Sequence, residues 1–297
     1  MTATDPEGNS ATCAAVVTVQ DNIAPVAACQ NATVSLNSAG NYTLVPGDVD
    51  GGSSDVCGVS YSLSNTSYNC GNIGANAVTL TVTDPSGNND NCSATVTIQD
   101  NTAPTAICQN VTIQLNAAGS ASTTANDVDN GSNDACGVSG LSLSQATFNC
   151  SEAGNNVETL TVSDASGNDG TCAVQITVQD NIAPIAICQD ITLQLNSGGT
   201  ATTTATAIDN GSNDACGIGS LTLSQTTFVC AEVGANTETL TVEDNNGNTT
   251  TCNTTITVQD NVAPVAVCQD ITVQLNAGGN ATANPVLANN GLSLIHI

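Results

Sequence analysis

Residues 158–178 read ETLTVSDASGNDGTCAVQITV, and this stretch decides the fold class. Apolar and polar residues alternate over residues 160–162 and 174–178, on either side of a Gly-Asn turn, as in half-buried β-strands. The same alternation occurs at residues 111–115 and 141–143. These segments are rich in Val, Ile and Thr and are bounded by Gly, Asn, Asp and Pro. The pattern predicts an all-β unit, a β-sandwich of about seven short strands.

The stretch belongs to a repeat. Matching prolines lie at Pro25, Pro104, Pro184 and Pro264, which gives steps of 79, 80 and 80 residues. A period of this length is typical of a small self-contained domain rather than of a solenoid coil. We therefore expect a tandem array with the following boundaries: a partial repeat at 1–20, complete repeats at 21–99, 100–179 and 180–259, and a partial repeat at 260–291.

The two ends do not follow the repeat. Residues 1–5 (MTATD) align with residues 80–84 (LTVTD), so the chain is expected to start inside a repeat. Residues 292–297 (LSLIHI) resemble a translated sequencing adapter, which predicts a non-native tail on a fragment of a longer protein. His296, the only histidine, therefore receives no role.

The charged side chains are almost all acidic. The chain has no Lys or Arg against 26 Asp and Glu, a formal net charge of −26. Such a polyanion is a poor partner for nucleic acids and for anionic membrane surfaces, and its natural partners are cations. Schiff-base chemistry and a Ser-His-Asp triad are excluded, so no enzyme is expected. A glycosidase-type pair of carboxylates is the catalytic alternative.

Cysteines recur in sets of four within each complete repeat. Cys13 and Cys268 are left over, one in each partial repeat. An even recurring set in such a chain predicts disulfides made in an oxidising compartment, and hence an extracellular or cell-surface protein. Zinc is the alternative, although no CxxC spacing occurs. The sets are Cys29, Cys57, Cys70 and Cys92; Cys108, Cys136, Cys150 and Cys172; Cys188, Cys216, Cys230 and Cys252.

Four cysteines allow three pairings per repeat. In an immunoglobulin-like sandwich the first and last strands can run parallel side by side, which favours Cys108 with Cys172. Cys136 would then pair with Cys150. The other repeats would follow the same scheme: Cys29 with Cys92, Cys57 with Cys70, Cys188 with Cys252, and Cys216 with Cys230.

Three motifs together resemble a known family. DNxAPxAxCQ, DNGSNDACG and TLTVxDxxGNxxxC occur in fixed order, followed by TVQD. This combination is similar to the hyalin-repeat type of immunoglobulin-like domain, and to its tandem form in long surface proteins exported by gliding bacteria. Hyalin repeats usually carry Cys-Pro where this chain has Cys-Gln, so ligand recognition is not carried over. The resemblance implies a secreted adhesion or matrix module without catalysis.

Acidic residues suggest calcium at the repeat joints. In an immunoglobulin-like topology, two loops lie at the same pole as the linker, and oxygen ligands without a counter-charge are suited to Ca²⁺. The DNTAP linker is also similar to the DNAP linker of cadherins, although the other cadherin calcium motifs are absent. The alternative is that these residues only form turns. The expected ligands are Asp100, Asn101, Asp127, Asp129, Asp134, Asp164 and Asn168, and in the next repeat Asp180, Asn181, Asp209, Asp214, Asp244 and Asn248.

These features predict a structural stalk or adhesin repeat region, stapled by disulfides and stiffened by calcium at its joints. Its partners would be other domains of the same long chain. The alternative is a set of repeats that themselves bind surface glycans or neighbouring cells. Sugar recognition usually uses aromatic platforms, and the chain has no Trp, three Tyr and two Phe.

Overall fold

The computed structural model describes residues 1–290, so the predicted tail at 292–297, with His296, lies outside the described residues. The chain divides into two compact units, each of which is described by itself. The first comprises Met1–Gln109, Val128–Ser144 and Thr159–Val174, and the second comprises Asn110–Asp127, Gln145–Glu158 and Gln175–Ile297. No helix among the described residues has the length and apolar character needed to cross a membrane.

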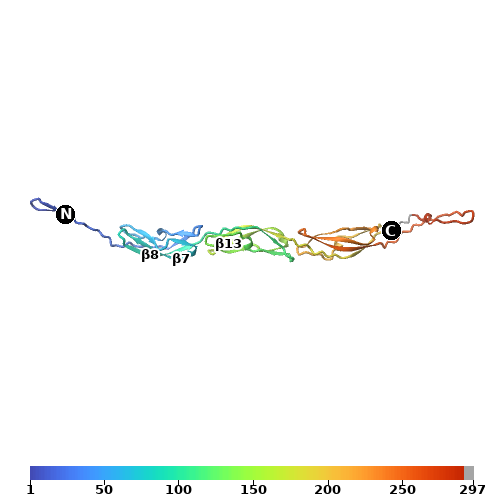
Figure 1. Cartoon of the computed structure of the whole chain (residues 1–297), viewed down its shortest axis with the longest axis horizontal. Helices are drawn as coiled ribbons and strands as arrows, with labels where there is room; N and C mark the ends of the chain where they lie inside the picture. Colours follow the sequence, from blue (N-terminus) through green and yellow to red (C-terminus); the bar gives the residue numbers. More distant parts are fainter. Residues whose placement is uncertain (291–297) are drawn as a thin grey trace. The chain divides into compact units, whose positions relative to one another are not determined.

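The first unit contains the repeat at residues 21–99. One sheet has the order β3-β8-β7-β5 and a second sheet pairs β4 with β6. β3 runs parallel to β8, with Ala32 opposite Val96, and β7 and β8 form a long antiparallel hairpin (Figure 1). The elements are β3 (Ala32–Ser35), β4 (Asn41–Thr43), α1 (Pro46–Val49), β5 (Ser60–Leu63), β6 (Ser67–Asn69), η1 (Cys70–Asn72), β7 (Gly74–Thr83) and β8 (Asn89–Gln99), preceded by the paired strands β1 (Thr2–Thr4) and β2 (Ser10–Thr12).

The second unit contains the repeat at residues 180–259, which has the same topology. The sheet order is β15-β20-β19-β17, with β15 parallel to β20, and β16 pairs with β18. The elements are β15 (Ile191–Gln194), β16 (Thr200–Thr202), α3 (Ala205–Ile208), β17 (Ile218–Leu223), β18 (Thr227–Val229), η3 (Cys230–Glu232), β19 (Gly234–Asp244) and β20 (Thr249–Gln259), followed by η4 (Pro285–Ala288).

The central repeat has the same strands, and the division between the two units passes through it. The sheet order is β9-β14-β13-β11, with β9 parallel to β14, and β10 pairs with β12. The all-β prediction is confirmed, but each complete repeat has six strands rather than about seven, because the segment before its first strand makes only isolated bridges, here Thr105 with Asn133 and Cys108 with Asp129. The elements are β9 (Val111–Gln114), β10 (Ser120–Ser122), α2 (Ala125–Val128), β11 (Val138–Leu143), β12 (Thr147–Asn149), η2 (Cys150–Glu152), β13 (Gly154–Asp164) and β14 (Asp169–Gln179).

The core of each repeat follows from the two-residue period of its strands. In the second unit Leu240 and Val242 of β19 face the core together with Ile256 and Val258 of β20, and all four are at most 1% exposed. Phe228 of β18, the largest residue of this core, is fully buried. The long hairpin therefore supplies four of the eight buried residues of this core.

The disulfide pairing agrees with the sequence prediction for one set of cysteines and contradicts it for the other. Cys29 bonds Cys92, Cys108 bonds Cys172 and Cys188 bonds Cys252, as expected from parallel first and last strands. The predicted bond between Cys136 and Cys150 is wrong. The structure instead joins Cys70 to Cys136 and Cys150 to Cys216, so each of these bonds links one repeat to the next.

Strand direction explains the error. In the second unit, Cys216 precedes β17 and Cys230 follows β18. β17 runs parallel to β15, because one parallel pairing (β15 with β20) and two antiparallel pairings (β20 with β19, β19 with β17) separate them in the sheet. β18 has the same direction, because the turn at Asn196 reverses the chain before β16 and β16 pairs antiparallel with β18. The second and third cysteines of a repeat therefore lie at opposite ends of the strands, and the predicted pairs Cys57 with Cys70 and Cys216 with Cys230 are not formed. Cys57 has an exposed thiol in the described chain.

One core residue of the first repeat carries a polar group without a partner. Tyr68 is 2% exposed, and its hydroxyl has no hydrogen-bond partner among the described residues. The equivalent residues, 80 positions later and again 80 later, are Phe148 and Phe228. We expect Tyr68→Phe to raise the free energy of unfolding of this repeat by about 1–2 kcal/mol, because an unsatisfied buried hydroxyl is removed.

The matched control is Tyr42→Phe in the facing strand. The Tyr42 hydroxyl donates a hydrogen bond to Asp48 Oδ2 at 3.0 Å, so its loss should lower the stability by about 1 kcal/mol. All three tyrosines of the chain lie between residues 42 and 68, so tyrosine fluorescence during urea unfolding reports this repeat alone. Equal effects of the two substitutions would contradict the difference in hydrogen bonding.

Candidate cation site at the linkers

The aspartates that open the two linkers between the complete repeats are buried. Asp100 follows β8 and Asp180 follows β14, and they are 5% and 7% exposed. Each turns the chain by accepting a hydrogen bond at Oδ1 from the N–H two residues later, from Thr102 at 3.0 Å and from Ile182 at 3.1 Å. The second oxygen, Oδ2, has no hydrogen-bond partner in either residue within the described part of the chain.

A second aspartate and a cysteine lie beside each of these carboxylates. In the first unit, ligand atoms of Asp100, Asp134 and Cys136 all lie within 4.8 Å of one another. Asp134 comes from the loop before β11, and its Oδ1 accepts a hydrogen bond from the Cys136 N–H at 2.7 Å. Equivalent groups are formed by Asp180, Asp214 and Cys216 in the second unit and by Asp21, Asp55 and Cys57 in the first.

The electrostatics of the pair favour a cation. At an effective dielectric of about 20, two unit negative charges about 4–5 Å apart repel by roughly 3–4 kcal/mol before screening. The chain has no Lys or Arg to offset this repulsion. A buried carboxylate oxygen without a hydrogen bond adds a desolvation cost. A divalent cation that prefers oxygen ligands would remove both penalties.

The disulfide limits which atoms can act as ligands. Cys136 is bonded to Cys70 and Cys216 to Cys150, so neither sulfur is a thiolate. Carboxylate oxygens are then the charged ligands of these two groups, which suits Ca²⁺ or Mg²⁺ better than a thiophilic metal. Sequence reasoning missed the cysteine beside each acidic pair, and it missed the bonds that join Cys136 and Cys216 to the preceding repeat.

Asp164 and Asn168 connect the linker to the turn between β13 and β14. Asp164 is 4% exposed, and both of its oxygens accept hydrogen bonds from Asn168 at 2.8 Å. Burial raises the pKa of the Asp164 carboxyl, but hydrogen bonds from the Asn168 side chain and backbone lower it, and the balance leaves the pKa below its ordinary value. The Asn168 amide also donates to the backbone oxygen of Asp100 at 3.0 Å. Asp244 and Asn248 repeat this arrangement with Asp180.

These contacts give Asp164 and Asn168 a positioning role. Gly167 makes the turn possible with a φ of 90°, a conformation that suits glycine. The amide of Asn168 then holds the linker backbone next to the hairpin. The turn therefore fixes the place of Asp100 without supplying a free carboxylate oxygen of its own.

The other predicted ligands make hydrogen bonds outside these acidic groups. Asp127 accepts hydrogen bonds from the Thr124 N–H and hydroxyl, at the start of α2. Asp129 accepts from the Ser132 N–H at 3.1 Å, and Asp209 does the same with Ser212 at 3.0 Å. The side-chain amides are occupied as well: Asn101 donates to Ser35 Oγ at 2.8 Å and Asn181 donates to Gln114 Oε1 at 2.7 Å.

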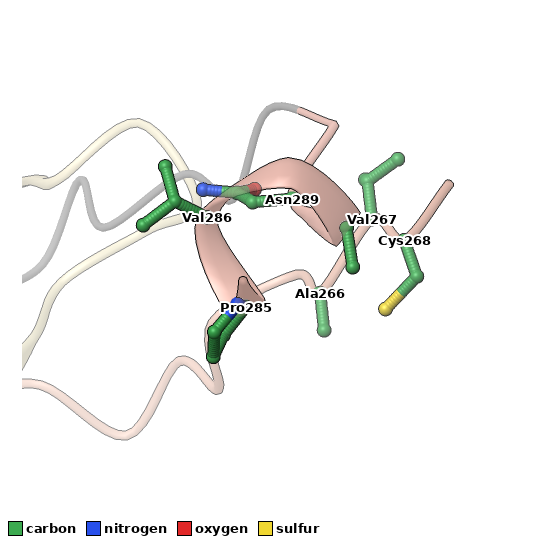
Figure 2. Close-up of a pocket in the computed structure, with 7 residues that line it drawn as sticks. Ala266, Val267, Cys268, Pro285, Val286 and Asn289 are labelled. Atoms are coloured by element: carbon green, nitrogen blue, oxygen red, sulfur yellow. The ribbon is translucent and has the colours of Figure 1, made fainter. Parts of the chain in front are cut away.

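A surface hollow near the end of the described chain has a different origin. It is lined by a mainly apolar set, drawn in Figure 2: Ala266, Val267, Cys268, Pro285, Val286, Ala288 and Asn289. Several of these residues correspond to residues that pack in the core of the preceding repeat, such as Cys188 and Ile208. In the repeat at 180–259, β19 and β20 cover the equivalent core residues. No strand of the described residues covers the residues that line the hollow. The hollow is an uncovered core face without a set of converging polar groups.

No protein-family model matches the sequence, and no curated protein is similar to it. Solved structures with partial similarity include mouse cadherin-23 EC22-24, at 13% identity and a TM-score of 0.35, covering 79% of this chain and 96% of that one. Protocadherin Gamma B7 extracellular cadherin domains 1-4 match at 16% identity and 0.30, covering 69% of this chain and 63% of that one. Sidekick-1 immunoglobulin domains 1-5 match at 10% identity and a TM-score of 0.33, covering 80% of this chain and 59% of that one. No role follows from TM-scores of this size.

Proposed function

We propose that this chain is an extracellular structural repeat region of the adhesion type, in which Ca²⁺ binds between the paired aspartates at each linker. The disulfides support an oxidising, extracellular location, since such bonds are rare in reducing compartments. The order of the hyalin-like motifs supports membership in a tandem adhesion array. The role is mechanical: the repeats space and hold other domains of a longer surface protein.

One observation carries the calcium part of the proposal. Asp100 and Asp180 each bury a carboxylate oxygen that has no hydrogen-bond partner among residues 1–290, next to a second carboxylate. Turn formation explains the first oxygen of each residue but not the second. An ion bound by Asp100 and Asp134, and another bound by Asp180 and Asp214, would use the unpaired oxygen. Backbone carbonyls and water would complete the six to eight ligands that Ca²⁺ takes.

Calorimetric titration of the intact protein with Ca²⁺ tests this proposal. We expect saturable binding, and at a free concentration about 100 times the dissociation constant a stabilisation of about 2.7 kcal/mol per site. The double variant Asp100→Asn/Asp180→Asn should lose the binding at these two linkers, because each of the two pairs keeps only one charge, and only the group at Asp21 and Asp55 stays unchanged. Asp127→Asn, which alters a carboxylate outside the pairs, should leave it unchanged. Absence of binding in the native protein, or equal loss in Asp127→Asn, would reject the site.

A further inference from the structure

The disulfides form two separate series. The first series joins the first and last strands of one repeat and spans 63 or 64 residues: Cys29–Cys92, Cys108–Cys172 and Cys188–Cys252. The second joins one repeat to the next and spans 66 residues: Cys70–Cys136 and Cys150–Cys216. The two series share no cysteine, so each can be followed along the chain independently of the other.

The first series defines what we call the linker path. It runs from Cys92 through the linker to Cys108, crosses the disulfide to Cys172, and continues through the next linker to Cys188. Each linker segment, from Cys92 to Cys108 and from Cys172 to Cys188, covers 16 residue steps of the 80-residue period. The disulfide replaces the rest of the period.

The second series defines the strand path. It crosses the disulfide from Cys70 to Cys136, follows β11 and β12 to Cys150, and crosses the next disulfide to Cys216. The segment from Cys136 to Cys150 covers 14 residue steps. This path avoids both linkers, whereas the linker path avoids β11 and β12.

We propose that the two paths make this region a doubly connected tether, which stays in one covalent piece after a backbone cut in either path. The inference goes beyond the proposed function and does not depend on calcium. It rests only on the order of cysteines in the sequence and on the five bonds of the structure. A cut in the linker leaves the strand path whole, and a cut between β11 and β12 leaves the linker path whole.

The same connectivity limits how far the region can lengthen under tension. A fully extended chain spans about 3.3–3.6 Å per residue, so an 80-residue repeat without disulfides could reach roughly 260–290 Å. With the bonds intact the shorter path fixes the limit, and 14–16 residues reach only about 50–60 Å. Unfolding a repeat therefore adds several-fold less length than it would in the reduced protein.

A glycine lies beside one sulfur of each disulfide in the strand path. A Cβ atom on Gly119 would lie 2.6 Å from Cys150 Sγ, and one on Gly40 would lie 2.7 Å from Cys70 Sγ. Both glycines have positive φ, at 70° and 73°. The absence of a side chain at these two positions is what lets the sulfur of one repeat approach the next.

The absence of Lys and Arg supplies the test, because trypsin has no site in the natural chain. Thr105→Lys places a single exposed site in the linker path, and Ala146→Lys places one in the strand path. Each variant is digested under denaturing, non-reducing conditions that trypsin tolerates, with chelator present, and the mass is measured before and after reduction. We expect each nicked protein to remain one species until reductant releases two fragments.

Two matched backgrounds show which bond holds each nicked protein together. Thr105→Lys with Cys70→Ser/Cys136→Ser should separate into fragments without reductant. Ala146→Lys with Cys108→Ser/Cys172→Ser should do the same. Exchanging the backgrounds should restore a single species. Release of fragments from Thr105→Lys with all native cysteines would overturn the proposal, because it is the outcome expected if Cys136 were bonded to Cys150.

Discussion

Phe228→Ala is expected to lower the free energy of unfolding of the third repeat by about 3–5 kcal/mol. Phe228 is fully buried and is the largest side chain of a core otherwise made of Leu, Ile, Val and Ala. Because the repeat has about 80 residues and a thin core, such a loss is a large share of the total stability. The cavity opens between the two sheets, where β18 faces the long hairpin β19–β20.

Val229→Ala in the next position is the matched control. Val229 points away from the core and is 44% exposed, so its truncation should change stability by less than about 0.5 kcal/mol. Hydrogen exchange of the amides in β19 and β20 measures the effect in this repeat alone. Similar protection in both variants would mean that Phe228 does not hold the sheets together.

The fold class could be predicted from the sequence because its signal is local. The alternation at residues 160–162 and 174–178 places every second side chain on one face, and β13 and β14 bury those side chains, including Leu160, Val162 and Ile176. The parallel pairing of β9 with β14 follows from the topology of the sandwich. Cys108 lies just before β9, and Cys172 lies near the start of β14. Because the two strands are parallel, the two cysteines come together.

The bonds between repeats could not be derived in the same way, since they depend on the direction of two strands in different sheets. Ser144, Gln145 and Ala146 join β11 to β12 without the Asn-Gly, Asp-Gly or Gly-Gly pair of a tight hairpin. The two strands are not paired with each other, and β12 belongs to the second sheet. The direction of β12 carries Cys150 away from Cys136.

The sequence also could not show which acidic residues keep a carboxylate oxygen available for a cation. Composition identifies loops rich in Asp and Asn, but it does not show which oxygens are already used. Asp164 and Asp129 satisfy their carboxylates within local turns, whereas Asp100 keeps one oxygen buried and unpaired. Only the three-dimensional arrangement separates the turn-forming aspartates from the candidate ligands.

Removing the bond between the first and last strands should have an effect as large as that of losing the aromatic core residue. Cys29 and Cys92 close a loop of 63 residues, and the chain-entropy model gives about 4 kcal/mol for a loop of this size. Both cysteines also pack against the core of the first repeat, so serine at these positions loses apolar contact as well. Cys29→Ser/Cys92→Ser is therefore expected to destabilise this repeat by about 4 kcal/mol.

Tyrosine fluorescence during urea unfolding measures this change, because all three tyrosines belong to the first repeat. Cys57→Ser is the control, since Cys57 is exposed and forms no disulfide in the described chain. Its midpoint should stay within the error of the native value. A shift below about 1 kcal/mol in the double variant would show that native packing, rather than the constraint on the unfolded chain, holds the first and last strands together.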